Sequence, residues 1–225
     1  MQLIQVNATA VLWRNVEVIR PPQAVGNAIR LGVDHILQIR IHGRGGQGVV
    51  TAAEMLSVAA FFQGRHAQAF PSFGSERTGA PVVAFCRIDD RPIRLREPIQ
   101  APDVLIVQDA HLLQQIDVFQ GLDPKGHVLI NTRRSLEDLG LTEIAAQLPK
   151  GHVVTLPATE IAMKHLGRPL PNAVLLGGFA AMTGIISLAA VVHAIGEKFH
   201  GDIARRNVAA ATEAHAMLAD LEAAR

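Results

Sequence analysis

The feature that most constrains this chain is a glycine-rich turn between a strand-like run and a helix-like run. Its glycines stand at Gly43, Gly45 and Gly48, a G-x-G-x-x-G spacing. Glycine lets the backbone turn tightly and approach a ligand, and the N–H groups that open the following helix attract an anion. The context therefore predicts a loop that contacts a phosphate. The alternative is a tight strand-to-helix turn whose glycines serve only close packing.

The residues after the turn argue against a nicotinamide dinucleotide as the ligand. Such folds usually carry an Asp or Glu about 20 residues after the glycines to hold the adenosine ribose. Here residues 65–69 read Arg-His-Ala-Gln-Ala and contain no carboxylate. We therefore expect the phosphate to belong to another carrier, with Arg44, Arg77 and Lys164 as candidate charges near it.

The order of apolar runs predicts an α/β fold: a Rossmann-like, mostly parallel sheet with helices on both faces and a β-hairpin. Strands are expected at residues 36–42, 104–107, 127–130 and 153–156. Helices are expected at residues 49–63, 111–119, 135–147, 159–166 and 202–223. The hairpin is expected to pair residues 82–88 with residues 93–96. Residues 68–81, which hold two prolines and two glycines, are expected to form a long functional loop.

One window of the sequence is apolar enough to raise the question of a membrane span. Residues 173–195 contain no formally charged side chain and are long enough to cross a bilayer. Glycines and small polar residues interrupt this window, and Ser187 is a good N-cap for a helix that begins at Leu188. We therefore expect two buried helices rather than a transmembrane segment.

Charge and cysteine content exclude several classes of function. The 21 Lys and Arg residues nearly balance the 20 Asp and Glu residues, so no general attraction to nucleic acid or to an anionic membrane is expected. The only cysteine, Cys86, excludes an internal disulfide and an iron–sulfur cluster held by this chain's cysteines alone. We expect Cys86 to be a core thiol rather than a nucleophile. We expect no metal site, and a cytoplasmic location fits these features.

The first 35 residues are expected to form an N-terminal extension or arm ahead of one domain at residues 36–225. Residues 11–19 are rich in β-branched side chains and end before two prolines. Two alternatives stay open for this segment. It could lie on another subunit and place Trp13 there, or it could form an extra edge strand on its own domain.

Two long motifs closely resemble the gamma subunit of 2-oxoacid:ferredoxin oxidoreductases, of which pyruvate:ferredoxin oxidoreductase is the best-known member. The first is Gly-Arg-Gly-Gly-Gln-Gly-Val-Val-Thr-Ala at residues 43–52. The second is Gln-Ala-Phe-Pro-Ser-Phe-Gly-Ser-Glu-Arg at residues 68–77, followed by Gly-Ala-Pro at residues 79–81. Shorter matches follow as far as Arg205-Arg206-Asn207, so the resemblance extends to the C-terminal end.

The resemblance implies a Rossmann-like layer beside the active site of a multi-subunit enzyme, with no activity in the isolated chain. The joint reaction would be the oxidative decarboxylation of a 2-oxoacid with coenzyme A, giving an acyl-CoA and CO2 and passing electrons to ferredoxin or a similar acceptor. Alpha-, beta- and delta-type subunits would carry thiamine diphosphate, Mg2+ and [4Fe-4S] clusters. Pyruvate is the default substrate, and 2-oxoglutarate, phenylglyoxylate and indolepyruvate stay open.

We expect the glycine loop and the motif after it to face coenzyme A or the thiamine site. Coenzyme A has a pyrophosphate that suits the loop and needs no ribose carboxylate of the NAD type. The expected cofactor-binding residues are Arg44, Gly45, Gly46, Gln47, Gly48, Phe70, Phe73, Gly74 and Arg77, and no catalytic residue is identified. Two alternatives remain: a purely structural subunit that touches no small molecule, and a self-sufficient NAD(P)-binding oxidoreductase.

Overall fold

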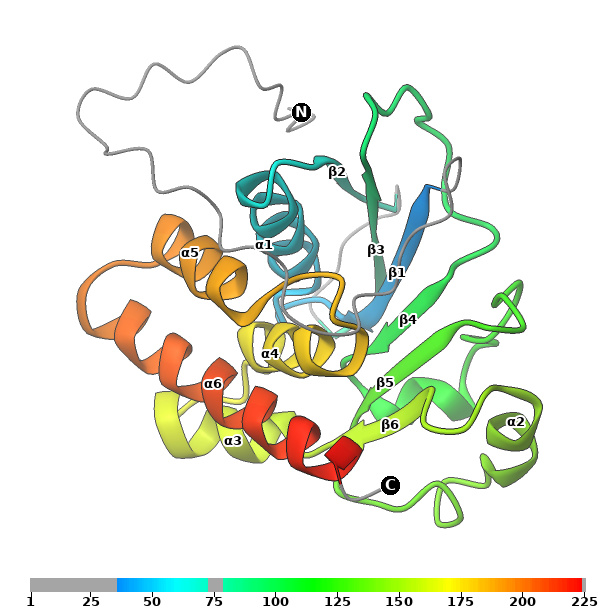
Figure 1. Ribbon diagram of the computed structural model, residues 1–225. Helices are drawn as coiled ribbons and strands as arrows, with labels where there is room; N and C mark the ends of the chain where they lie inside the picture. The colour runs from blue at the N-terminus through cyan, green and yellow to red at the C-terminus, as the bar shows by residue number, and fades with distance from the viewer. Residues whose placement is uncertain (1–35, 73–78, 224–225) are drawn as a thin grey trace.

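A six-stranded mixed sheet organises the chain in the computed structural model, which describes residues 36–72 and 79–223 (Figure 1). The strand order is β2-β3-β1-β4-β5-β6. Strands β1, β4, β5 and β6 run parallel, whereas β3 is antiparallel to its neighbours β1 and β2. The strands are β1 (Leu37–Arg44), β2 (His66–Pro71), β3 (Pro81–Asp89), β4 (Val104–Val107), β5 (His127–Asn131) and β6 (Val153–Leu156). The expected Rossmann-like, mostly parallel α/β fold is confirmed.

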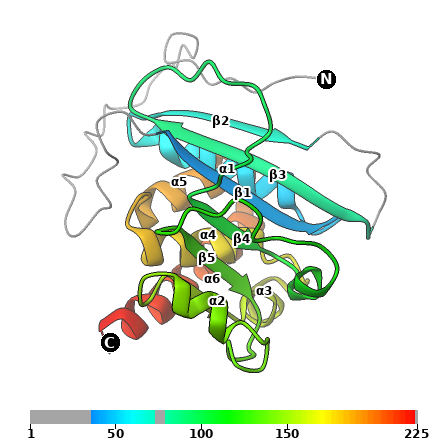
Figure 2. The same cartoon turned by 90° about the vertical axis from the view of Figure 1, so that its right-hand side faces the viewer.

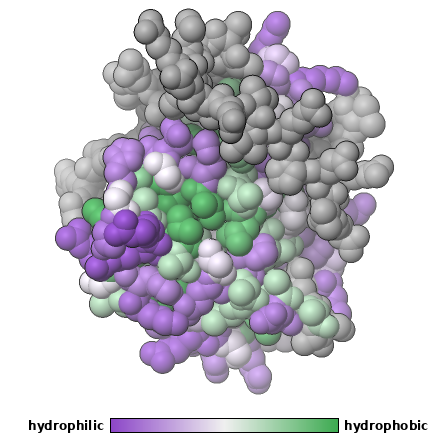
Figure 3. All heavy atoms as spheres, turned by 60° about the vertical axis from the view of Figure 1, so that its left-hand side comes forward, coloured by the Kyte–Doolittle hydropathy of each residue, from purple (hydrophilic) through white to green (hydrophobic). Residues whose placement is uncertain are grey.

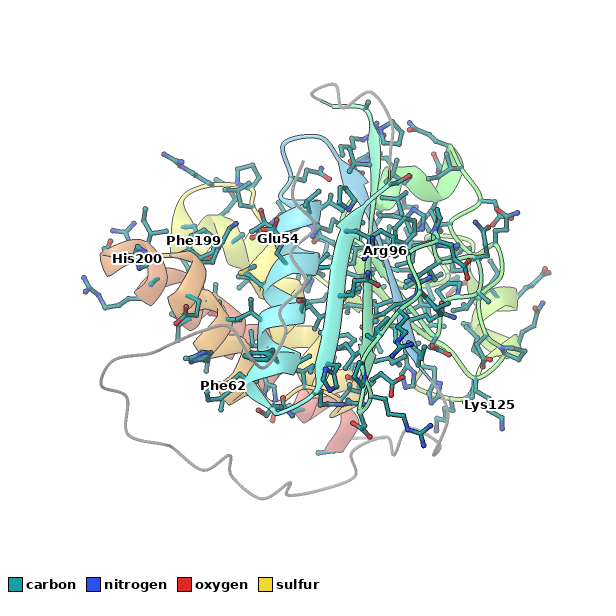
Figure 4. All side chains as sticks on the ribbon, turned by 90° about the horizontal axis from the view of Figure 1, so that it is seen from above. Glu54, Phe62, Arg96, Lys125, Phe199 and His200 are labelled. Carbon is teal, nitrogen blue, oxygen red and sulfur yellow. The ribbon has the colours of Figure 1, made fainter. Side chains whose placement is uncertain are left out.

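Five helices cover one face of the sheet. They are α1 (Val49–Phe62), α3 (Ala158–Leu166), α4 (Asn172–Thr183), α5 (Leu188–Lys198) and α6 (Gly201–Ala223). In Figure 4, Glu54 and Phe62 lie on this helical side, whereas Arg96 and Lys125 lie on the other side of the sheet. Figure 3 looks toward the helical side and shows an apolar area bordered by hydrophilic residues.

The apolar window at residues 173–195 forms two helices, as the sequence predicts, but only α4 is buried along its length, whereas α5 buries one face through Ala190, Val191, Ala194 and Ile195. Nearly every residue of α4 is buried, and α4 packs beneath α6 (Figure 1). The Ser187 hydroxyl accepts a hydrogen bond from the Ala190 N–H at 3.2 Å and so caps α5. Among the residues that the structure describes, no helix is both long and apolar enough to cross a membrane.

The second face of the sheet is covered by shorter elements (Figure 2). They are the 3-10 helix η1 (Ala110–Gln114), the helix α2 (Thr142–Gln147) and the loops around them. Leu112, Val118 and Leu141 pack here against alternate residues of β4 and β5. Because both faces of these two strands are covered, their apolar runs are nearly unbroken.

The hairpin predicted from residues 82–88 and 93–96 is wrong in its second strand. Residues 93–96 form no strand, and β3 pairs instead with β2, which occupies the first part of the predicted loop at residues 68–81. Because β3 already has β1 on its other edge, no edge remains for a further strand. Ile93 and Ile99 still point inward and are buried.

Two predicted helices are shorter in the structure. The helix expected at residues 111–119 is only the 3-10 helix η1. The helix expected at residues 135–147 begins at Thr142, and the Ser135 hydroxyl instead accepts a hydrogen bond from the Asp138 N–H at 3.0 Å within a turn. Ser and Asp favour such local turns, which compete with a helix.

Two stacked histidines lie at the amino ends of β5 and β6, and we expect them to make the free energy of unfolding depend on pH. The rings of His127 and His152 lie 3.8 Å apart between centroids. Burial and the neighbouring His152 lower the pKa of His127 to about 4. Because the pKa of His127 is lower in the folded chain than in the unfolded chain, the unfolded chain binds more protons than the folded chain between about pH 4 and pH 6.5. The contribution of His127 to the free energy of unfolding is therefore fully present above pH 6.5 and is lost as the pH falls toward 4.

We expect His127 to lower the free energy of unfolding of the full chain by about 2 kcal/mol between pH 7.5 and pH 5. The variant His127→Phe keeps a ring that can stack but cannot titrate, so its loss over the same range should be smaller by that amount. His42, whose pKa burial and Arg40 also lower to about 4, keeps a similar contribution in both proteins. Urea unfolding at several pH values measures the difference, and identical pH profiles for the two proteins would contradict the prediction.

Candidate functional site

A cleft of about 720 Å³ lies at the carboxyl ends of the parallel strands. It is lined by the segments at the ends of four strands: residues 45–47 after β1, residues 108–111 after β4, residues 131–134 at the end of β5, and residues 159–160 after β6. Residues 169–171, before α4, and Leu113, Gln114 and Leu139 complete the lining. Ligands of open α/β sheets bind at this edge, where the connections from neighbouring strands diverge. The volume is typical of a small-molecule site.

The glycine loop forms one wall of the cleft, and two of its glycines are required by close packing. A Cβ atom on Gly43 would stand 2.6 Å from Val49 Cγ2. Gly48 has a φ of +75°, and a Cβ there would stand 2.6 Å from Asn172 Nδ2. Gly46, in contrast, is exposed, and no atom lies within 4 Å of where its Cβ would stand. The loop therefore packs tightly on its inner side and presents open backbone toward the cleft.

Side chains within the loop hold it to the end of β4. The side-chain Oε1 of Gln47 accepts a hydrogen bond from the Arg44 backbone N–H at 2.8 Å, and the side-chain Nε2 donates to Asp109 at 3.3 Å. The Arg44 guanidinium donates to Asp109 at 2.7 Å, to the Gly79 carbonyl at 3.1 Å and to Gln115 at 2.7 Å. Arg44 and Gln47 therefore fix the shape of the loop.

Asp109 is the acidic centre of this arrangement. Burial alone would raise its pKa, but hydrogen bonds from His111, Arg44 and Gln47 together lower the pKa of its carboxyl group. The carboxylate is therefore ionised at neutral pH, and the adjacent Arg44 balances its charge. An anionic ligand in the cleft meets an ion pair here rather than an isolated negative charge.

The floor of the cleft lies at the ends of β4 and β5. The Asn131 amide donates to the Gln108 carbonyl at 2.8 Å and to the Thr159 hydroxyl at 2.7 Å, and it accepts from the Thr159 N–H at 3.0 Å. Asn131 thus joins the strand ends to the first turn of α3. Gln108 is 1% exposed, and neither the nitrogen nor the oxygen of its side-chain amide has a hydrogen-bond partner among residues 36–72 and 79–223.

Arginines that the sequence interpretation did not single out lie on the opposite wall. Arg133 and Arg134 lie in the loop after β5, one residue beyond its end, and line the cleft. Arg133 approaches Glu160 at 3.4 Å but keeps 78% of its side chain exposed, and Arg134 donates to the Asp138 carbonyl. Their position after a parallel strand is a signal that could have identified them from the sequence.

The structure brings some of the predicted site residues together and leaves others apart. Gly45, Gly46 and Gln47 line the cleft, whereas Gly48 lies behind it against Asn172 and Arg44 lies outside the lining. Phe70 is buried with Phe85 and Ile99 in a separate cluster, and Lys164 pairs with Glu213 on α6 at 2.7 Å. Phe73, Gly74 and Arg77, and Trp13 in the expected arm, lie outside the described residues.

The chemistry of the lining is that of a binding site. The lining combines the glycine loop, two arginines, side-chain amides and hydroxyls with His111, the carboxylates of Asp109 and Glu160, and apolar residues. Each carboxylate lies beside an arginine, Asp109 beside Arg44 and Glu160 beside Arg133. Cys86 lies elsewhere, is fully buried, and burial raises the pKa of its thiol. The prediction of a core thiol is therefore confirmed. The arrangement suits an elongated ligand that carries phosphate groups.

The chain matches a known family along most of its length. The sequence model described as "Pyruvate ferredoxin/flavodoxin oxidoreductase" matches residues 38–217. The pyruvate synthase subunit PorC of Methanosarcina barkeri is 53% identical over 158 residues, which are 70% of this chain and 84% of that protein. The pyruvate/ketoisovalerate oxidoreductases common subunit gamma of Thermococcus kodakarensis is 48% identical over 181 residues, which are 80% of this chain and 95% of that protein.

A solved structure is similar in both sequence and fold. The crystal structure of pyruvate oxidoreductase subunit PORC from Thermotoga maritima superposes with a TM-score of 0.68 at 33% identity. The match covers 81% of this chain and 97% of that one. This chain and the Thermotoga maritima subunit therefore share the same α/β architecture.

Proposed function

The chain belongs to the pyruvate ferredoxin/flavodoxin oxidoreductase family, and we propose that it forms the coenzyme A-facing wall of a pyruvate-oxidising complex. It is a gamma subunit of a pyruvate or 2-oxoacid ferredoxin oxidoreductase. The resemblance carried by residues 43–52 and 68–81 is thereby confirmed. The role of the cleft and the identity of the 2-oxoacid are the parts that we propose.

The geometry of the cleft supports coenzyme A as the ligand. Residues 45–47 line the cleft after β1, and Arg133 and Arg134 line it after β5, two strands away. The Gly45 and Gln47 N–H groups already donate to the Ala80 and Arg44 carbonyls at 2.9 and 3.0 Å, so Gly46 is the residue of this loop segment that would offer its N–H to a ligand. Backbone N–H groups at the start of a helix and guanidinium groups are the two kinds of partner that phosphates prefer. This pairing of a glycine loop with two arginines is the observation that carries the proposal.

Pyruvate is the substrate that we propose for the complex. The relatives described above are named for pyruvate, or for pyruvate together with ketoisovalerate. Phenylglyoxylate, indolepyruvate and 2-oxoglutarate are less well supported, because those three relatives are not named for them. The 2-oxoacid would bind mainly on other subunits, so a change in this cleft is expected to alter the response to coenzyme A more than the response to pyruvate.

The redox cofactors are assigned to partner subunits. A [4Fe-4S] cluster needs several cysteine thiolates, and this chain offers only the buried Cys86. Alpha-, beta- and delta-type subunits would hold thiamine diphosphate with Mg2+ and the clusters, and ferredoxin would take the electrons. Thiamine diphosphate would supply the carbanion chemistry of decarboxylation. The residues of this chain would bind and orient the acyl acceptor.

Omission of the chain tests this assignment. We expect a complex prepared without it to lose pyruvate oxidation that depends on coenzyme A, and we expect added purified chain to restore it. The assay follows reduction of ferredoxin or a viologen dye with pyruvate. Unchanged activity without the chain would overturn the proposal, and pyruvate oxidation with NAD(P)+ by the chain alone would support the self-sufficient alternative.

A further inference from the structure

Gln108 stands out among the side chains of the cleft because its hydrogen-bonding groups are buried and unused. It is the first residue after β4, and its backbone is fully paired: its N–H donates to the His42 carbonyl at 2.7 Å and its carbonyl accepts from Asn131 at 2.8 Å. Its side-chain amide, in contrast, finds no partner for either its nitrogen or its oxygen within the part of the chain that the structure describes. Buried amide groups are normally hydrogen-bonded, so each exception calls for a reason.

Other glutamines of the described residues leave fewer groups unpaired: the buried Gln68 on β2 lacks a partner for its oxygen alone, whereas Gln108 lacks one for both atoms. The Gln47 amide uses both of its polar atoms within the loop. The Gln38 amide donates to the Ala101 carbonyl at 3.0 Å and accepts from Arg87 at 3.4 Å. Unpaired burial costs free energy that an apolar side chain of the same size would not cost. Packing alone therefore does not explain a glutamine at this position.

The surroundings of Gln108 place its amide next to the ligand space. Gln108 lines the cleft, and its Cβ lies 3.2 Å from where a Cβ on Gly43 would stand, directly beneath the glycine loop. The Asn131 amide beside it is already committed to the Gln108 carbonyl and to Thr159. The Gln108 amide, with a donor and an acceptor side by side, is therefore an uncommitted polar group at the edge of the cleft.

We propose that Gln108 recognises a ligand group with an adjacent hydrogen-bond donor and acceptor, and that it thereby selects coenzyme A rather than a simple phosphate. This inference rests on the proposed function. Coenzyme A carries such a pair in two places, the secondary amides of its pantetheine arm and the edge of its adenine ring. Because the amide is unpaired in the free chain, pairing with a ligand relieves a cost and adds to affinity.

The test is titration calorimetry of the assembled complex with three ligands. They are coenzyme A, phosphopantetheine, which lacks the adenosine, and adenosine 3′,5′-bisphosphate, which lacks the arm. We expect Gln108→Met to weaken coenzyme A binding about tenfold. We also expect it to weaken whichever fragment carries the recognised group and to leave the other unchanged. The matched control is Gln147→Met on the exposed end of α2, which should bind as the wild type does.

Stability of the full chain provides the second readout. Because Gln108→Met removes two unpaired buried groups, the variant should be as stable as the wild type or more stable, while it binds coenzyme A less well. If the methionine variant does not fold, Gln108→Leu replaces it in both measurements. Unchanged coenzyme A affinity in a folded variant overturns the inference. If substitution of Arg133 and Arg134 also leaves the affinity unchanged, the proposed function fails as well; if that substitution weakens binding, only the role of Gln108 fails.

Discussion

Replacing Gly177 by alanine is expected to lower the free energy of unfolding of the full chain by about 3 kcal/mol. Gly177 lies in the middle of α4, where that helix crosses beneath α6 (Figure 1). A Cβ at this position would stand 2.1 Å from the carbonyl oxygen of Ala211 and 2.8 Å from its Cα. These atoms belong to the backbone of α6, so no rotation of a side chain can relieve the clash, and the two helices must separate.

Gly196→Ala is the matched control for this prediction. Gly196 lies in α5, is exposed, and has no atom within 4 Å of where its Cβ would stand. Alanine has the higher helix propensity, so this variant should be more stable by about 0.5–1 kcal/mol. Chemical denaturation of the three proteins gives the comparison. If Gly177→Ala is also as stable as the wild type, the packing of α4 against α6 described here is wrong.

The second large effect is expected in ligand binding. Substitution of both Arg133 and Arg134 by glutamine should weaken coenzyme A binding to the assembled complex about 10- to 100-fold. That range corresponds to about 1.5–3 kcal/mol, the usual strength of hydrogen bonds to charged groups. The affinity of the wild type should also fall as salt is raised, and the double variant should respond less, because fewer charge pairs remain to be screened.

Arg94→Gln with Arg96→Gln provides the control for charge alone. Both arginines are exposed in the loop after β3, outside the lining of the cleft, so the control removes the same two positive charges elsewhere. It should bind coenzyme A as the wild type does. Equal weakening by both pairs would mean that net charge, rather than the cleft, controls affinity. No weakening by the Arg133 and Arg134 pair would remove both residues from the site.

The central strands were predictable from the sequence because they are buried on both faces. Residues 104–107 and 127–130 are apolar runs too short for helices, and each became a parallel strand close to its expected bounds. Strand β2 was missed because its sequence, His-Ala-Gln-Ala-Phe-Pro, has weak strand propensity. Pairing with β3 outweighs that propensity, and only the tertiary structure shows such pairing.

The site was predictable only in part, for a related reason. The spacing of the glycines placed the loop correctly at the end of β1, and Gly45 to Gln47 line the cleft. The sequence interpretation gave Arg44 a role toward a phosphate, but it could not show that Asp109, which follows β4 in the chain, would pair with Arg44. Arg133 and Arg134 reach the cleft because β5 lies two strands from β1 in the sheet, a neighbourhood that local patterns do not reveal.

The structure of the assembled complex with coenzyme A bound would test the central proposal most directly. We expect phosphate oxygens of coenzyme A within hydrogen-bonding distance of the guanidinium group of Arg133 or Arg134, with residues 45–47 on the other side of the ligand. Coenzyme A held entirely by other subunits, with this cleft filled by their side chains, would contradict the proposal.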